Sequence, residues 1–132
     1  MNLYLAGPMS GIPEFNFPLF NRTAKRLRQE GHSVFNPAER DIERHGGTDI
    51  SKGNKDGCQT KAHTEHGFSL GEALADDTHW ICMNADAIVL LPGWEQSAGA
   101  NAEWALCKAL QKDPNRKRRM LFFYLNEGDL PL

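Results

Sequence analysis

The sequence predicts an α/β fold: a three-layer sandwich, Rossmann-like or flavodoxin-like, in which a parallel sheet of four to five strands has helices on both faces. Short apolar runs alternate along the chain with segments of helical periodicity. The runs 2–6 and 85–91 are apolar throughout, as expected for strands that are buried on both faces. Each run is closed by an adjacent glycine and proline. This pattern is typical of a parallel sheet with crossover helices.

The first third of the chain predicts a strand, a helix and a second strand. Residues 2–6 form the first strand, and apolar residues at helical spacing predict a helix over about 16–30. Gly31 ends that pattern. Residues 33–35 predict a short strand, because β-branched and aromatic residues favour strands and the following proline cannot continue the ladder.

The stretch 38–68 changes to glycine, histidine and charged residues with almost no apolar periodicity. We expect it to build no core and either to serve as a lid or binding loop or to be partly disordered, and a short helix near 39–45 is compatible with its pattern. Cys58, His63 and His66 have side chains that can bind metals, but their spacing matches no zinc pattern. No metal site is therefore predicted.

The second half of the chain alternates helices and strands. Helical pattern resumes over about 69–84, with Asp76–Asp77 as a candidate break. The run 85–91 predicts a central strand. Ser97 is the predicted N-cap of a helix that extends to about Lys112, and residues 120–124 predict the last strand.

The composition argues against several classes of protein, including nucleic-acid-binding, membrane-spanning and secreted disulfide-rich proteins. The 132 residues carry 15 basic and 17 acidic side chains, a net charge of −2, so broad attraction to nucleic acid is not expected. The basic run 116–119 is interpreted as a solvated turn, with nucleic-acid or partner contact as the alternative. No apolar run is long enough for a membrane span, no secretory signal is recognised, and three widely spaced cysteines build no disulfide framework. We expect a single cytoplasmic domain over 1–132.

Ligands of such sheets bind at the carboxyl ends of the strands, so we expect a ligand site to be formed by the segments 7–13, 36–40 and 92–103. Glu103 shares a helix face with apolar residues, so we expect its carboxylate to point inward to the crevice, the alternative being an exposed glutamate. Ser97 opens the same helix, where free N–H groups could bind a phosphate, although a simple cap explains it too.

Asp77 and Asp86 flank the segment before the central strand. Considered alone, each aspartate is interpreted as a helix cap or a surface charge. If Asp77 reached the crevice of Glu103, the two carboxylates would form the pair that cleaves glycosidic bonds, one attacking the anomeric carbon and the other protonating the leaving group.

Several stretches in this order resemble the nucleoside 2-deoxyribosyltransferase superfamily, which includes the deoxynucleoside 5'-monophosphate N-glycosidases. They are Tyr4-Leu-Ala-Gly-Pro-Met9, Asp77-x-x-x-Ile81 before the strand 85–89, and Ser97-x-Gly-x-x-x-Glu103. The segment 91–100 looks closer still to an uncharacterised phage and prophage branch. The resemblance covers both ends of the chain and leaves the loop 40–68 unmatched.

The resemblance implies catalytic roles for three residues. Glu103 would attack the sugar, Asp77 would assist at the base, and Tyr4 would orient the nucleophile. Asp86 would supply a supporting contact. Relatives that use free nucleosides tend to carry aspartate six residues before the glutamate, whereas nucleotide-cleaving relatives tend to have serine, and here that residue is Ser97.

The implied substrate is therefore a (deoxy)nucleoside 5'-monophosphate. Ser97 and Gly99 would cradle its phosphate, with Gly7, Ser10 and Gly11 closing the other side. The reaction, hydrolysis or base transfer, needs no metal or organic cofactor. The resemblance also implies a homodimer or larger homo-oligomer.

Three rival hypotheses remain at this stage. Pro92-Gly93 through Glu103 partly echoes the Pro-Gly-Gly-x-Gly-Thr-x-x-Glu motif of phosphoribohydrolases, without its second glycine and threonine. A non-catalytic nucleotide-binding or sensor module would keep the pocket and lack the activity. A nucleic-acid-binding protein would use residues 116–119.

Overall fold

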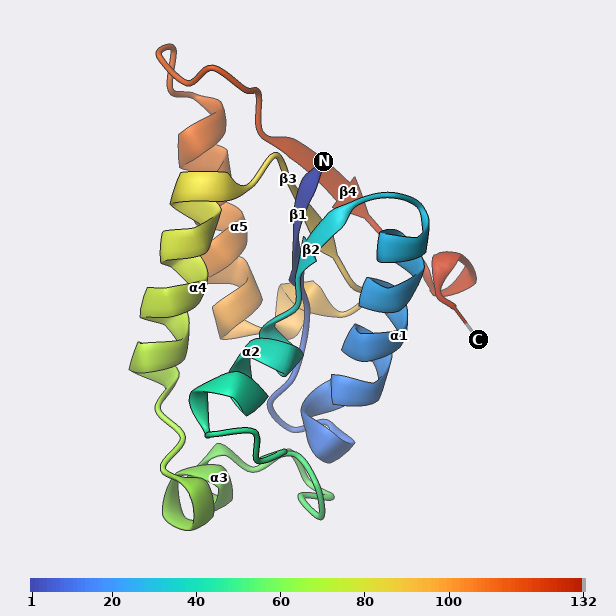
Figure 1. Ribbon diagram of the computed structural model, residues 1–132, viewed down its shortest axis with the longest axis vertical. Helices are drawn as coiled ribbons and strands as arrows, with labels where there is room; N and C mark the ends of the chain where they lie inside the picture. Colours follow the sequence, from blue (N-terminus) through green and yellow to red (C-terminus); the bar gives the residue numbers. More distant parts are fainter. Residues whose placement is uncertain (132) are drawn as a thin grey trace.

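The computed structural model describes residues 1–131 and forms a parallel four-stranded sheet covered by helices on both faces, a Rossmann-like three-layer arrangement (Figure 1). The strands are β1 Asn2–Ala6, β2 Ser33–Phe35, β3 Ala87–Leu90 and β4 Leu121–Tyr124. The α-helices are α1 Phe17–Gln29, α2 Pro37–Arg44, α3 Gln59–His66, α4 Leu70–Asn84 and α5 Ala98–Gln111. Single-turn helices span Pro13–Asn16 (η1), Trp94–Gln96 (η2) and Glu127–Asp129 (η3). The predicted fold class is confirmed.

The strand order is β2-β1-β3-β4, and all three pairings are parallel. Tyr4 of β1 lies beside Phe35 of β2 and Ile88 of β3, which fixes the register of the two central strands. The chain leaves β1 in one direction to β2 and returns to the other side as β3. Such a reversal opens a crevice at the carboxyl ends of the two central strands.

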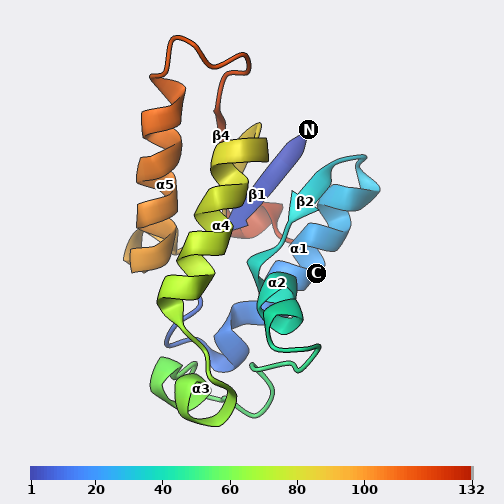
Figure 2. The same ribbon diagram turned by 60° about the vertical axis from the view of Figure 1, so that its left-hand side comes forward.

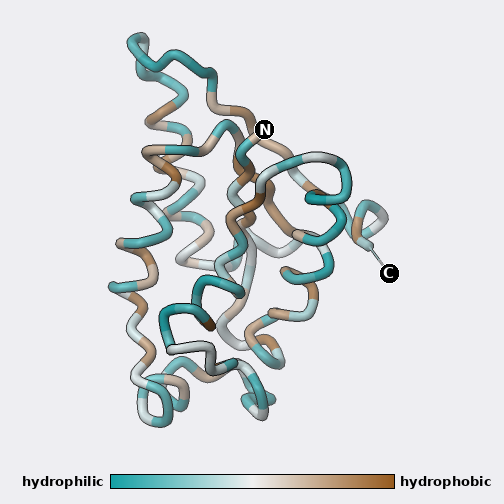
Figure 3. Tube along the Cα trace, viewed as in Figure 1, coloured by the Kyte–Doolittle hydropathy of each residue, from teal (hydrophilic) through white to brown (hydrophobic). Residues whose placement is uncertain are grey.

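Alternate residues of β1 and β3 divide between two cores. Leu3, Leu5 and Val89 face α1, whereas Tyr4 and Ile88 face α4 and α5. Because both faces are covered, both strands are apolar along their length, as the sequence pattern predicted. Figure 2 shows α4 and α5 side by side on one face with α1 on the other, and Figure 3 shows hydrophobic residues gathered along the sheet.

Side-chain caps set the starts of three helices. The Ser97 hydroxyl accepts from the backbone N–H of Ala100, as predicted, and the Ser69 hydroxyl accepts from Glu72. The Asn36 side chain accepts from the N–H of Ala38. α4 runs without interruption through Asp76–Asp77. The candidate break there was wrong, because buried Asp77 and Ile81 continue the inward stripe across it.

The stretch 38–68 is more ordered than its composition predicted. It holds α2 and α3, and its Ala38, Ile50 and Ala62 are buried in the α1-side core. Single buried residues in short elements leave no helical period to detect, so the prediction that this stretch builds no core was wrong. The loop between α2 and α3 is joined to the start of the chain by two backbone hydrogen bonds, Gly11 N to Gly57 O and Glu14 N to Asn54 O, each 2.9 Å.

No helix among residues 1–131 is long and apolar enough to span a membrane.

Candidate active site

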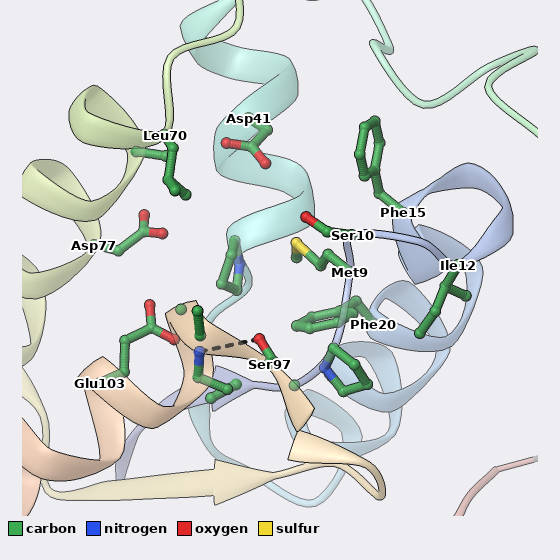
Figure 4. A pocket seen from close by; sticks show the side chains of 18 of the residues that line it. Met9, Ser10, Ile12, Phe15, Phe20, Asp41, Leu70, Asp77, Ser97 and Glu103 are labelled. Atoms are coloured by element: carbon green, nitrogen blue, oxygen red, sulfur yellow. Dashed lines mark hydrogen bonds between the residues drawn. The ribbon is translucent and has the colours of Figure 1, made fainter. Parts of the chain in front are cut away.

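A cavity of about 830 Å³ opens at the carboxyl ends of β1 and β3, where the strand order reverses (Figure 4). Its floor comes from the residues after these strands, including Gly7 and Pro92. The helices α2, α4 and α5 supply further walls, and α3 contributes Gln59. Its size is typical of a small-molecule site.

Three titratable groups from separate elements meet in this cavity. Tyr4 of β1, Asp77 of α4 and Glu103 of α5 all line it, and they are only 0%, 5% and 6% exposed. Asp77 and Glu103 are buried because they lie on the inward stripes of their helices, with Ile81 and Cys107 one turn further along. Figure 4 shows both carboxylates directed into the same space. Glu103 therefore points inward, as expected, and Asp77 lies in the same cavity, which the sequence had left as a condition.

Glu103 is held by Tyr4, whose hydroxyl donates a hydrogen bond to Glu103 Oε2. Burial raises the pKa of Glu103 to about 8, with Asp77 and Asp41 adding to the rise and the Tyr4 hydrogen bond opposing it. Burial and the adjacent carboxylates also raise the pKa of Tyr4 well above its ordinary value. The phenol therefore keeps its proton and stays a donor.

Asp77 is also poised near neutrality. Burial raises its pKa to about 7, while Arg44 lowers it through a contact of 3.4 Å between Arg44 Nη1 and Asp77 Oδ1. Two buried carboxyl groups that both titrate between neutral and mildly basic pH can share the roles of nucleophile and acid.

The start of α5 provides a group of hydrogen-bond donors on the cavity wall. The N–H of Ala100 is taken by the Ser97 hydroxyl at 3.2 Å, while the N–H groups of Ala98 and Gly99 have no protein acceptor among the described residues. All four residues line the cavity. Free N–H groups at the positive end of a helix are suited to a phosphate.

A family model described as "Domain of unknown function (DUF4406)" matches residues 1–113. The chain belongs to the DUF4406 family. No curated protein and no solved structure matches it. The match takes in Tyr4, Asp77, Ser97 and Glu103, and it ends before β4.

Gly7 and Ser10 of the DUF4406 chain lie at the cavity as predicted. A Cβ on Gly7 would lie 2.8 Å from Leu91 Cβ, so only glycine lets the end of β1 approach the end of β3. The Ser10 hydroxyl accepts a hydrogen bond from Gln59 of α3 at 2.5 Å. Both contacts help to shape the wall opposite the carboxylates.

Two predicted binding residues do not line the cavity. Gly11 directs its N–H to Gly57 O and serves the loop contact described above. Asp86 lies before β3, at the opposite end of the sheet, where it accepts from the N–H of Asn2 at 2.7 Å and pairs with Arg118. Its assignment as a substrate contact was wrong, because the crevice forms where strands end and Asp86 precedes its strand.

Two residues of α2 join the site without having been predicted. Asp41 is 5% exposed and lines the cavity, and Arg44 pairs with Asp41, Asp76 and Asp77. The sequence contained a signal for these residues, because Asn36 and Pro37 begin a helix at the carboxyl end of β2. The segment predicted to border the crevice there stopped at residue 40, just before Asp41. Burial raises the pKa of Asp41, and Arg44 opposes the rise.

The remaining walls are apolar except for Gln96, and no lysine, arginine or histidine within residues 1–131 lines the cavity. Phe15 enters from η1, where Glu14, Phe15 and Asn16 have φ of 53, 53 and 62°, a left-handed turn that non-glycine residues rarely adopt. Phe15 packs near Phe68, with ring centroids 6.4 Å apart. An apolar cavity with a few convergent carboxyl groups suits an organic ring that carries polar edges.

The basic run and the cysteines, which could also bind ligands or react, lie outside the cavity lining. Arg116 and Arg118 of the basic run bind Ala85 O and Asp86, at the end of the sheet opposite the cavity. All three cysteines are free, with Cys58 and Cys82 exposed and Cys107 buried. The described residues contain no group of three or more His, Cys, Asp or Glu that could hold a metal ion.

Proposed function

We propose that this DUF4406 domain cleaves the N-glycosidic bond of a (deoxy)nucleoside 5'-monophosphate through a covalent glutamyl-sugar intermediate. The observation that carries the proposal is the meeting of Glu103, Tyr4 and Asp77, all nearly buried, in one cavity at the switch point of the sheet. The resemblance to the nucleoside 2-deoxyribosyltransferase superfamily assigns roles to the same three residues.

In the first step, a carboxylate oxygen of Glu103 attacks the anomeric carbon of the sugar. The bond from this carbon to the base nitrogen breaks, and its electron pair goes to the base. Asp77 supplies the proton that neutralises the departing base. The reacting state has Glu103 ionised and Asp77 protonated. Because the pKa of Glu103, about 8, lies above that of Asp77, about 7, this is the less populated placement of the proton in the free protein, about tenfold below the reverse placement.

In the second step, water attacks the same carbon and releases Glu103, while Asp77 takes up a proton from the water. An acceptor base in place of water would give transfer instead. Tyr4 donates to Glu103 throughout and directs one oxygen, Oε2, so that the other is free to attack. Nothing in this scheme requires a metal or an organic cofactor.

The proposed phosphate position is the start of α5. Ser97 and the free N–H groups of Ala98 and Gly99 lie six or fewer residues from Glu103, along one helix. Because no cationic side chain within 1–131 lines the cavity, the phosphate would be bound by neutral donors and the helix dipole.

We also propose that the protein is a homodimer or larger assembly, as the resemblance implies. The edge strand β4 supports this, because Leu121, Phe123 and Tyr124 are 38%, 40% and 49% exposed.

The function is tested by incubating the protein with ribo- and deoxyribonucleoside 5'-monophosphates and the matching nucleosides, and measuring free base by chromatography. Base release from a monophosphate that is lost in Glu103→Gln and kept in Glu95→Gln supports the proposal; Glu95 is exposed on η2, outside the cavity lining. Intact protein from a quenched reaction is then weighed by mass spectrometry for a sugar-phosphate adduct. No release, with or without an acceptor base, and recovery of an unaltered bound nucleotide would favour a nucleotide-binding module instead.

A further inference from the structure

Arg44 of α2 connects two helices through carboxylates without lining the cavity. Its guanidinium pairs with Asp41 on its own helix, with Asp76 at 2.5 Å and with Asp77 at 3.4 Å, the last two on α4. Nη2 donates a hydrogen bond to Asp41, and Nη1 donates to Asp76 and Asp77. The Arg44 side chain is only 18% exposed, so these contacts are shielded from solvent.

We propose that Arg44 is a positioning residue for glycosidic-bond cleavage, which holds the Asp77 carboxyl in its place at the cavity by tying it to Asp76 and Asp41. This inference rests on the proposed function. Arg44 itself does not touch the substrate; it acts through Asp77.

The surroundings of Asp77 show why a cation is needed there. Tyr4 approaches from β1, Glu103 from α5, Asp41 from α2, and Asp76 is its neighbour on α4. Arg44 is the one cation in direct contact with Asp77 in the part of the chain that the structure describes. Without it, the buried Asp41, Asp77 and Glu103 would lie near one another in a poorly hydrated space with no cation in contact with Asp77, and like charges repel strongly in such a space.

The shape of the side chain matters as well as its charge. A guanidinium has separate N–H groups in a fixed plane and can bind carboxylates on two helices at once, whereas a lysine ammonium is a single point charge on a flexible stem. Replacing Arg44 by lysine therefore separates the electrostatic effect from the positional one.

Arg40 offers a matched control. It also lies on α2 and binds Asp76, at 2.7 and 3.1 Å, but it makes no contact with Asp77 and its side chain is 41% exposed. Arg40→Gln removes a cation from the same network and leaves the Arg44–Asp77 contact in place.

The test compares kcat, KM and the pH dependence of kcat/KM for wild type, Arg44→Gln, Arg44→Lys and Arg40→Gln. Loss of the Arg44 charge raises the pKa of Asp77, so Arg44→Gln is expected to move the pH optimum up by about one unit and to lower kcat by about tenfold or more. Arg44→Lys should restore the wild-type optimum while kcat stays reduced, and Arg40→Gln should resemble wild type. An Arg44→Gln profile with the wild-type optimum would overturn the proposal, since a merely structural role lowers activity without moving it.

A second measurement does not need activity. The Asp77 carboxyl is titrated by carbon NMR in aspartate-labelled protein, with its signal identified from Asp77→Asn. An upward shift of the Asp77 pKa in Arg44→Gln and none in Arg40→Gln supports the link, even if the wild type cleaves no nucleotide and the proposed function fails. An unchanged Asp77 pKa overturns it. If Arg44→Gln does not fold, Arg44→Lys decides, because wild-type kcat in that variant would contradict a positional role.

Discussion

The hydroxyl of Tyr4 donates a hydrogen bond to the carboxylate of Glu103, a residue 99 positions further along the chain. One residue belongs to a central strand and the other to the helix that follows the neighbouring strand. The contact therefore exists only when the β1–β3 pairing and the packing of α5 are both in place. It couples the integrity of the fold to the state of the proposed nucleophile.

Replacing Tyr4 by phenylalanine should remove this donor and keep the ring packed against Phe35 and Trp80. The hydrogen bond lowers the pKa of Glu103, so its loss should raise that pKa further and move the activity optimum to higher pH. We expect kcat/KM at neutral pH to fall by about tenfold or more. The pH profile of base release measures this. Tyr124→Phe is the control because Tyr124 is exposed on β4, and an equal effect in both variants would refute the role of Tyr4.

Glu103→Gln should change how stability depends on pH. A carboxyl whose pKa is raised in the folded protein binds more protons there than in the unfolded chain between the two pKa values. Stability is then full below pH 4.5, the ordinary glutamate value, and is lost as the pH rises toward about 8. We expect the free energy of unfolding of the wild type to fall between pH 5 and pH 8 and that of Glu103→Gln to fall less. Denaturant titrations at both pH values check this, and parallel slopes would contradict it.

Two substitutions at Ser97 should separate its capping role from phosphate binding. Ser97→Ala loses the cap of α5, at a cost of about 1 kcal/mol in stability. Ser97→Asp keeps a capping oxygen but places a negative charge where the phosphate is proposed to bind. It should therefore retain stability and raise KM for monophosphates more than for nucleosides. Equal KM changes for both substrate classes would argue against a phosphate at this helix.

Gly57 should be the most sensitive glycine of the loop between α2 and α3. It has φ of +61°, and a Cβ there would lie 2.3 Å from Ile12 O, so Gly57→Ala must push the loop away from the start of η1. Gly53 has φ of +78° but open space around it, so Gly53→Ala costs only backbone strain. We expect Gly57→Ala to lower the unfolding temperature more than Gly53→Ala and to raise KM. Equal unfolding temperatures would show that this contact contributes little.

The sequence could predict the elements that bury continuous apolar faces. β1 and β3 are apolar runs between turn residues, and α5 has an inward stripe that includes Glu103, so the placement of that carboxylate followed from helical periodicity. α2 and α3 are only 8 residues long each and bury few apolar side chains, so their pattern is too short to read. Asp41 and Arg44 were missed for this reason.

The assignment of Asp86 to the substrate site was wrong because it did not take into account the direction in which the chain enters β3. A residue that precedes a parallel strand and one that follows it lie at opposite ends of the strands, and only the carboxyl ends border the cavity. Asp86 pairs with Arg118 at the amino ends.

The separation between the amino and carboxyl ends of the strands has a practical consequence. The turn between α5 and β4, with Lys117 and Arg119 exposed, lies at the amino ends, remote from the cavity (Figure 1). A tether or fluorophore attached there would leave the cavity mouth open to solvent. The protein could thus be immobilised on a surface or coupled to a reporter in a defined orientation, with the candidate active site facing the bulk solution.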